Sequence, residues 1–444
     1  MPPKPFLWLF TAIILSSSTS LAQEAAPVST PTAMEKMAET TAILSGKITL
    51  KAAIEKALAS SPRIKSAQAG VLASQGERAQ AGVWPNPEIG IQAENFAGES
   101  RYRGFDSSEV TLGVSQVIEL GGKVSGREAV AEQELSLSRL GQNAERLDII
   151  RDTSNSYVNA VAAQEMLKLA VGQKELADDL FQEVRERVNA AREPLIQKSK
   201  AEIMLSTASF ARERAERELS HAKHVLSNLW GGHGDDFQLE ENDLFALTPP
   251  MTEAGVEAKM DQNPSLQRYA INETRMQAKY ELEKAYAIPD PRINVGVRDF
   301  RDTGDKALAV GITIPIPIFN SNQGGIERAR HEVSKAHSDA QTVKLKMVEN
   351  VRESLEAQIN AYSQAQSLKS TVLPAAEKAF TLSRQGYRAG KFPYLEVLDA
   401  QRTLFEVKQQ YITSLKEYHT AKAEVERLTA RHADYKAKEE SHAQ

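Results

Sequence analysis

The chain has 444 residues, of which 41% are hydrophobic, 25% are charged and 6% are aromatic. It contains no cysteine, which excludes disulfide frameworks, zinc–thiolate sites, cysteine nucleophiles and cysteine-linked lipid anchors. The net charge of −5 argues against a nucleic-acid partner.

The N-terminus has the pattern of an export signal. Lys4 precedes the apolar run Phe6–Leu15, and small residues follow it. Because this run is shorter than the ~20 residues that span a bilayer, we predict a cleaved signal peptide at 1–22 and not a membrane anchor. Residues 23–45 are rich in Ala, Thr, Pro and Ser, which is typical of a flexible leader. The sequence therefore predicts an exported protein.

The remainder of the chain repeats one plan at an interval of about 200 residues. The matching motifs share prolines, glycines and aliphatic residues and follow the same order in both copies. They are Ser61-Pro62 with Asn263-Pro264, Pro85-Asn86-Pro87 with Pro289-Asp290-Pro291, Leu112-Gly113-Val114 with Val310-Gly311-Ile312, and Glu193-Pro194-Leu195 with Phe392-Pro393-Tyr394. We predict a first structural repeat at 46–250, a second at 251–430, and a disordered charged tail at 431–444.

Each repeat is predicted to open with two helices. Short amphipathic helices are expected at Leu50–Ala59 and Val256–Gln262, and a second helix is expected from the next proline to the double-proline motif. The Pro-x-Pro motif then forbids helix.

Beyond the double prolines, apolar and polar residues alternate, as they do in β-strands. The alternation covers 89–94, 110–115, 293–298 and 308–314, so each repeat is expected to contribute one β-hairpin. Such strands suit the ~25 Å apolar band of an outer-membrane barrel, and aromatic residues fall at their ends. Taken alone, the four strands are more typical of a soluble sandwich.

A long stretch with helical spacing of apolar residues follows each hairpin. The stretches are Gly126–Ala190 and Gly325–Ala389, each of 65 residues, and Pro374 is expected to kink the second. Each predicts a helix of about 100 Å, which no ordinary globular domain accommodates. Return helices are expected at 195–230 and 394–429. One long helix would then pair with two shorter ones in a tube, with strands at one end and helical tips at the other.

Four motifs make the mature chain resemble the TolC family of outer-membrane efflux ducts. They are Trp84-Pro-Asn-Pro-Glu-Ile, Leu112-Gly-Val-Ser-Gln-Val-Ile-Glu-Leu-Gly-Gly-Lys123, Ile314-Pro-Ile-Pro-Ile-Phe-Asn-Ser-Asn-Gln-Gly324, and Tyr387-Arg-Ala-Gly-Lys-Phe-Pro-Tyr-Leu-Glu-Val-Leu-Asp-Ala-Gln401. The Glu-Asn-Phe-Ala-Gly stretch at 94–98 and the Glu-Leu-Gly-Gly-Lys turn are most similar to the heavy-metal, cobalt-zinc-cadmium-type RND efflux branch.

The resemblance implies a mainly α-helical fold with a small β part. Three chains, with four strands each, would form a twelve-stranded outer-membrane β-barrel that continues into a long periplasmic α-helical barrel. The four strands of one chain are too few to close a barrel. The eight strands of two chains would leave an interior filled by side chains, so an open lumen needs at least three chains. The implied partners are two further copies, a periplasmic adaptor protein, an inner-membrane RND pump and outer-membrane lipid. No cofactor, metal site or enzymatic activity is implied.

Glu396 and Asp399 are the candidate periplasmic gate. They lie three residues apart on the second return helix and so share one face, whereas the first repeat has Gln197 and Lys200 at these positions. Taken alone, the pair is typical of a solvated face with acids near a helix N-terminus. The resemblance instead implies a constriction ringed by six carboxylates, which would select cations.

Further candidates lie in the two tip turns. The resemblance implies a gate arginine four residues before Glu396, where this chain has Phe392, and Lys391 is the candidate substitute. Contacts to the adaptor are expected at the tips from Tyr387, Gly390, Lys391, Asn189 and Arg192. Gly390 is also explained by its place at a helix C-terminus.

His221 and His224 share a helix face, but a pair without a third ligand is more typical of a solvated surface than of a metal site. The sequence offers no nucleotide-binding loop and no catalytic constellation. We therefore predict an outer-membrane channel subunit that passively conducts heavy-metal cations, in the outer membrane of a bacterial cell with most of the chain in the periplasm. The alternatives are a duct for drug efflux or type I protein secretion, and a periplasmic coiled-coil scaffold or adaptor.

Overall fold

The computed structural model describes residues 47–232, 234, 236–240 and 244–431. The predicted signal peptide at 1–22, the leader at 23–45 and residues 432–444 of the predicted tail lie outside the described residues. The chain divides into two units, and the following description concerns the larger, Ile48–Asp235 with Leu239–Gln444. Within the first repeat, the two-residue strand β1 (Lys47–Ile48) precedes the helices and the two-residue strand β4 (Gln238–Leu239) follows them.

The first repeat opens with two helices that are capped by hydroxyl side chains. The Thr49 side chain accepts a hydrogen bond from the Ala52 amide, and the Ser61 side chain accepts one from the Arg63 amide next to Pro62. The elements of the repeat are α2 (Leu50–Ser60), α3 (Pro62–Ala81), β2 (Glu88–Glu94), the 3-10 turn η1 (Ser100–Tyr102), β3 (Glu109–Val117), α4 (Lys123–Asn189) and α5 (Leu195–Asn228).

The second repeat follows the same order. The Asn263 side chain accepts from the Ser265 amide beside Pro264, which is the counterpart of the Ser61 cap. The elements are α6 (Glu253–Met260), α7 (Pro264–Tyr286), β5 (Arg292–Phe300), β6 (Asp305–Thr313), α8 (Gln323–Ser367), the π-helical turn η2 (Leu368–Val372), α9 (Leu373–Arg388) and α10 (Tyr394–Leu428). The predicted helices and strands are all present, with bounds shifted by a few residues.

The second long helix is interrupted close to Pro374, as the sequence predicts. The interruption is the π-helical turn η2, which ends two residues before the proline. Proline has no amide hydrogen, and its ring clashes with the carbonyl of the preceding turn. The wider π-helical turn accommodates the hydrogen bond that is lost. In the first repeat α4 has no proline and continues unbroken for 67 residues.

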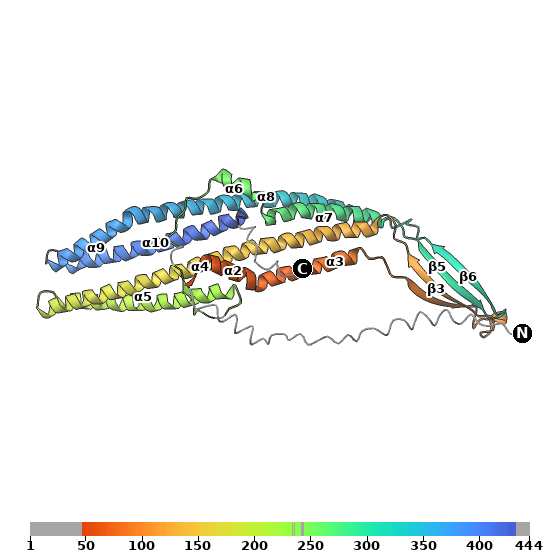
Figure 1. Cartoon of the computed structure of the whole chain (residues 1–444), viewed down its shortest axis with the longest axis horizontal. Helices are drawn as coiled ribbons and strands as arrows, with labels where there is room; N and C mark the ends of the chain where they lie inside the picture. Colours follow the sequence, from red (N-terminus) through yellow and green to blue (C-terminus); the bar gives the residue numbers. More distant parts are fainter. Residues whose placement is uncertain (1–46, 233, 235, 241–243, 432–444) are drawn as a thin grey trace. The chain divides into compact units, whose positions relative to one another are not determined.

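Each long helix packs along two shorter ones. α4 contacts α3 and α5, and α8 contacts α7 and α10, while α4 also joins the two repeats through α7 and α10 (Figure 1). Ala201, Ala208 and Ala215 are buried on α5 at intervals of seven residues, so that its backbone can approach α4 closely. The predicted pairing of one rod with two stacked helices is confirmed.

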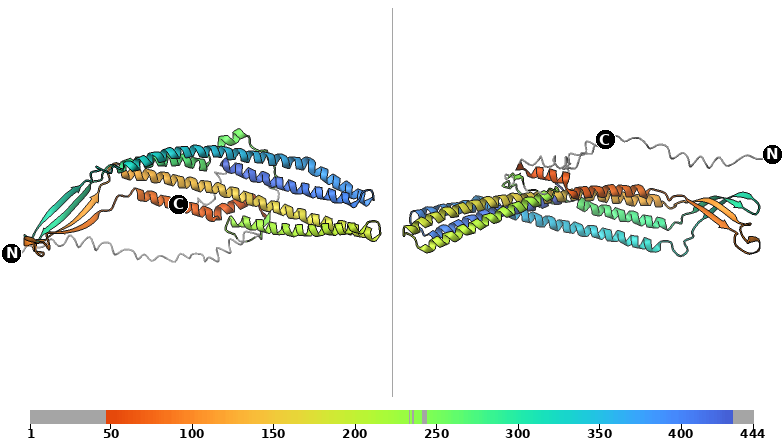
Figure 2. Two further views of the ribbon diagram at one scale, coloured as in Figure 1. Left: turned by 180° about the vertical axis from the view of Figure 1, so that it is seen from behind. Right: turned by 90° about the horizontal axis from the view of Figure 1, so that it is seen from below.

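The four strands form one antiparallel sheet in the order β2-β3-β5-β6 (Figure 2). Both predicted hairpins are present, and β3 pairs with β5 to join the repeats. In the part of the chain that the structure describes, β2 and β6 each have one unpaired edge.

The two faces of this sheet differ in chemistry. Alternate residues of every strand are large, apolar and exposed, and they form one face: Ile89, Ile91, Val110, Leu112, Val114, Ile293, Val295, Val297, Leu308, Val310 and Ile312. On the other face, Arg298 pairs with Glu94 at 3.3 Å and Glu109 at 3.1 Å. No second sheet covers the apolar face within the described residues, unlike in a soluble sandwich. Among the described helices, none has the length and hydrophobicity needed to cross a membrane.

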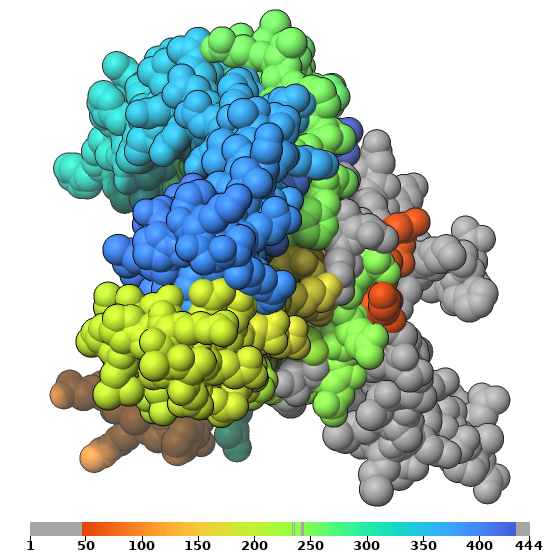
Figure 3. Space-filling model, turned by 90° about the vertical axis from the view of Figure 1, so that its left-hand side faces the viewer, coloured from red at the N-terminus to blue at the C-terminus, as the bar shows by residue number. Residues whose placement is uncertain are grey.

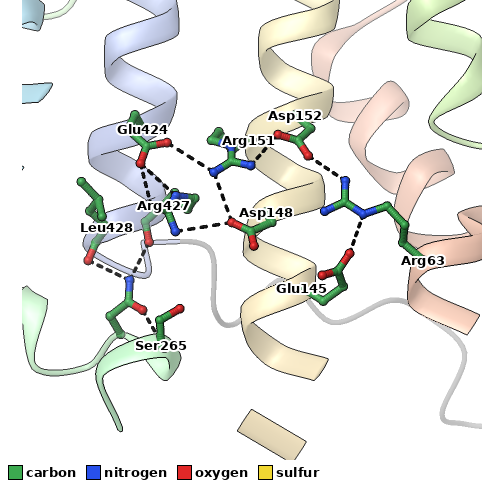
Figure 4. A network of polar contacts seen from close by, with 10 residues as sticks. Arg63, Glu145, Asp148, Arg151, Asp152, Ser265, Glu424, Arg427 and Leu428 are labelled. Carbon is green, nitrogen blue, oxygen red and sulfur yellow. Dashed lines mark hydrogen bonds and ion pairs between the residues drawn. The ribbon is translucent and has the colours of Figure 1, made fainter. Parts of the chain in front are cut away.

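A network of charged side chains joins the repeats midway along α4 (Figure 4). Arg151 lies between Asp148, Asp152 and Glu424, at 3.3, 2.7 and 3.6 Å. Arg427 of α10 contacts Asp148 at 3.4 Å and Glu424 at 2.7 Å. Burial raises the pKa of Asp148, although both arginines act in the opposite direction. The network ties α10 of the second repeat to α4 of the first.

Candidate gate at the helical tips

The turn between α9 and α10 is a Schellman motif. Gly390 adopts a left-handed conformation with φ of +70° and donates its amide to the Tyr387 carbonyl at 2.9 Å. The Lys391 amide donates to the Gly386 carbonyl at 2.8 Å. These two bonds satisfy the last free carbonyls of the helix, so the conformation of this turn accounts for Gly390.

The turn between α4 and α5 has the same bonds around a different residue. The Ala191 amide donates to the Val188 carbonyl at 3.0 Å, and the Arg192 amide donates to the Arg187 carbonyl at 2.8 Å. Ala191 takes the left-handed position with φ of +53°. An L-residue with a Cβ pays about 1 kcal/mol for this conformation, which glycine adopts freely.

We expect Ala191→Gly to stabilise the first tip by about 0.5–1 kcal/mol, because the strain outweighs the added freedom of the unfolded chain. Thermal unfolding of the detergent-solubilised protein, followed by circular dichroism, measures this gain. The matched control is Gly390→Ala, which introduces the same strain at the other tip and should destabilise it by a similar amount. Equal melting of Ala191→Gly and the unaltered protein, with a destabilised control, would contradict the prediction.

Two tyrosines form the core of the tips. The side chains of Tyr387 and Tyr394 are 0% and 1% exposed, and their ring centroids lie 5.7 Å apart. They pack in one apolar cluster with Leu180 and Val184 of α4 and Val397 of α10. Burial raises the pKa of each tyrosine to about 12. The cluster therefore holds both helical hairpins together near their ends.

Arg187 of α4 supports the end of α9. Its guanidinium carbon lies 4.2 Å from the ring centroid of Tyr387. The Nη2 atom donates to the carbonyls of Tyr387 at 2.8 Å and Arg388 at 3.1 Å. Arg388 in turn pairs with Glu183 of α4 at 3.3 Å. The last turn of the second repeat is therefore fixed by side chains of the first.

Phe392 occupies the place at which the resemblance implies an arginine. Its ring covers Gly386 so closely that a Cβ on that glycine would clash with the Phe392 ring. The position thus contributes packing to the turn. Lys391, the candidate substitute, is exposed and has no ion-pair partner among the described residues.

Glu396 and Asp399 lie on the exposed face of α10, opposite the buried side chains of Tyr394 and Val397. Neither carboxylate has an ion-pair partner within the described residues. The helical repeat places the exposed Glu406 and Glu417 within the same angular sector, farther from the tip. The exposed Arg402 lies on the same side of the helix between Asp399 and Glu406. The second repeat therefore presents two carboxylates without an ion-pair partner at its tip, on a face of mixed charge.

The other predicted tip residues divide into two groups. Gly390, Lys391, Asn189 and Arg192 are exposed at the ends of the two helical hairpins, which lie next to each other (Figure 3). The side chain of Tyr387 is fully buried, so it supports the turn and offers no surface for contact.

Sequence reasoning missed Arg187, which contacts the second tip from the first repeat. The only signal in the sequence was the repeat interval of about 200 residues, which places the last turn of α4 at the position equivalent to the last turn of α9. His221 and His224 are exposed, and no group of three or more His, Cys, Asp and Glu side chains suited to a metal occurs in the described part of the chain.

Comparisons with known proteins agree on one family. The model of the family "Outer membrane efflux protein" matches residues 53–232 and again 256–431. The chain is 30% identical to the cobalt-zinc-cadmium resistance protein CzcC of Cupriavidus metallidurans, over 87% of this chain and 91% of that protein. It is 27% identical to the nickel-cobalt-cadmium resistance protein NccC of Alcaligenes xylosoxydans, over 66% of each chain. The fold is similar to the crystal structure of a membrane protein from Pseudomonas aeruginosa, with a TM-score of 0.76, 16% identity and coverage of 86% and 92%.

Proposed function

This chain belongs to the outer membrane efflux protein family, and we propose that it is the channel subunit of a tripartite RND-type system that passively conducts heavy-metal cations. Its place is the outer membrane, with the helices in the periplasm. It is a transport protein and not an enzyme. The two matches to the family model also establish the internal duplication.

The observation that carries the proposal is the four-stranded sheet with one exposed apolar face. Contact with lipid stabilises such an apolar face, whereas its exposure to water is unfavourable in free energy. The free edges of β2 and β6 call for partner strands, because unpaired amides and carbonyls are not tolerated in a bilayer. Three copies joined edge to edge would form a closed barrel of twelve strands with the Arg298 side in the lumen.

The choice of heavy-metal cations rests on two further features. Two relatives carry names that refer to cobalt, zinc, cadmium and nickel resistance. The unpaired carboxylates of Glu396 and Asp399 at the tip of α10 would attract cations at the entrance, and we assign these two residues to the gate.

We further propose a periplasmic adaptor and an inner-membrane RND pump as partners. The exposed tip residues Gly390, Lys391, Asn189 and Arg192 would contact the adaptor, and Tyr387 would act indirectly by supporting the turn. The repeats are proposed to extend over 46–250 and 251–430.

Deletion of the coding sequence tests the substrate class. We expect the deletion strain to become sensitive to zinc, cobalt or cadmium, and expect the intact gene to restore tolerance. Dyes, antibiotics and an exported protein serve as parallel readouts. Unchanged metal tolerance with sensitivity to dyes would reject metal transport in favour of drug efflux, and a loss of secretion alone would favour type I export.

A further inference from the structure

An apolar segment continues from β6 toward α8. Ile314, Ile316, Ile318 and Phe319 expose 56, 78, 74 and 91% of their surface, and the last three values are among the highest for large apolar residues in the described chain. The segment lies beyond the last residue pair of the sheet, Arg292 with Thr313. It therefore has no neighbouring strand in the described chain.

The segment keeps the alternation of the strand before it. Leu308, Val310 and Ile312 belong to the apolar face of the sheet, and Ile314, Ile316 and Ile318 follow at the same interval of two residues. The intervening Pro315 and Pro317 have no amide hydrogens, so this backbone adds no unpaired donor at those positions. The segment thus continues the apolar face of β6 and needs few backbone hydrogen bonds to a neighbouring strand.

The equivalent connection in the first repeat is held differently. The Ile118 amide donates to the Pro291 carbonyl at 2.9 Å, and the Leu120 amide donates to Asp290 Oδ1 at 2.8 Å. Arg127 binds both carboxylate oxygens of Glu119, at 2.6 and 2.8 Å. That connector is fixed to the protein by polar contacts, whereas the second-repeat segment turns its aliphatic side chains outward.

Length gives a second argument. The apolar positions within the paired strand, from Leu308 to Ile312, cover about 10 Å of membrane depth at ~3.3 Å per residue and a tilt of ~40°. The Ile318 amide donates to the Ile316 carbonyl at 2.9 Å, so the backbone turns at Pro317. Extending the count to Ile316 gives about 20 Å, which is most of the usual ~25 Å apolar band of an outer-membrane barrel. At its other end the strand has Lys306, paired with Asp299 at 3.3 Å, which marks a polar limit.

We propose that Ile314–Phe319 is a lipid-binding segment that enters the periplasmic leaflet and contacts phospholipid acyl chains near the headgroups. This inference rests on the proposed membrane position of the sheet and adds a surface outside its paired strands. Continuity with the apolar face of the sheet identifies lipid as the occupant. A trimer would carry three such segments around its periplasmic rim.

Quenching of tryptophan fluorescence by brominated phosphatidylcholine tests the proposal. Single tryptophans are placed by Ile316→Trp, Ile318→Trp or Phe319→Trp in full-length mature protein that carries Trp84→Phe and Trp230→Phe, reconstituted in vesicles. We expect quenching within about twofold of that seen for Val310→Trp on the sheet face, and strongest with bromine close to the headgroup. Protein with only Trp84 replaced reports the buried Trp230, which is 6% exposed and should stay unquenched.

The controls distinguish failure of the lipid-binding segment from failure of the proposed membrane position of the sheet. Quenching of Val310→Trp without quenching at 316, 318 and 319 would overturn the lipid segment and leave the membrane position of the sheet intact. Such a result would assign the segment to a second copy of the chain. Absence of quenching at 310 as well would overturn both. Because three probe positions are used, the test remains decisive even if one of the substitutions prevents assembly.

Discussion

Replacing Glu396 with Gln and Asp399 with Asn should lower the cation-to-anion permeability ratio of the reconstituted channel at least about threefold. In the proposed trimer the change would remove six carboxylates from the proposed gate. A change of one kT in local potential alters the cation concentration about 2.7-fold, and clefts lined by one sign of charge reach several kT. The reversal potential in a salt gradient across a planar bilayer measures the ratio.

A matched control removes two carboxylates from the first repeat. Glu202→Gln with Glu213→Gln takes the same charge from the exposed surface of α5, and it should leave the selectivity nearly unchanged. The effect of the gate variant should also shrink at high salt, where the Debye length falls to about 3 Å at 1 M. Selectivity that is unchanged in the gate variant, or equally reduced in the control, would reject the assignment of the gate.

The sequence predicted the fold well where local rules determine it. Ser61-Pro62 and Asn263-Pro264 specify helix starts through side-chain caps and the fixed φ of proline, and the structure has both. The strict alternation around Leu112 likewise predicted the strands. The π turn at Leu368–Val372 was harder, because a proline predicts a disturbance of the helix but not the form in which the backbone absorbs it.

The site was less predictable because its supports come from distant parts of the chain. Local spacing identified Glu396 and Asp399 as neighbours on one face. It could not reveal that Arg187, 200 residues before Tyr387, donates to the end of α9. Nor could it show that Phe392 covers Gly386, since the resemblance implies an arginine at that position. Contacts between repeats depend on how the hairpins pack, and no periodicity in one segment encodes them.

Tyr387→Ala should destabilise the tips by about 3–5 kcal/mol, the usual cost of removing a buried aromatic side chain. The substitution would leave a cavity between α4, α9 and α10 and would remove the ring that faces Arg187. With the end of α9 less restrained, the proposed gate should open more often. We therefore expect a lower melting temperature and a higher mean conductance in planar bilayers.

Tyr387→Phe is the matched control, because it keeps the packing and removes only a buried hydroxyl that has no hydrogen-bond partner within the described residues. It should be neutral or stabilising by up to about 1 kcal/mol. The pH dependence gives an independent check. Tyrosine ionises near 10 in an unfolded chain and Tyr387 has a pKa of about 12 when folded, so its contribution to stability is complete below pH 10 and is lost as the pH rises toward 12. The Phe variant lacks this loss and retains those of Tyr394 and Tyr411, whose pKa values burial also raises, so its melting temperature should fall less between pH 8 and pH 11. If Ala and Phe variants melted and conducted alike, the buried ring would not be what holds the tip closed.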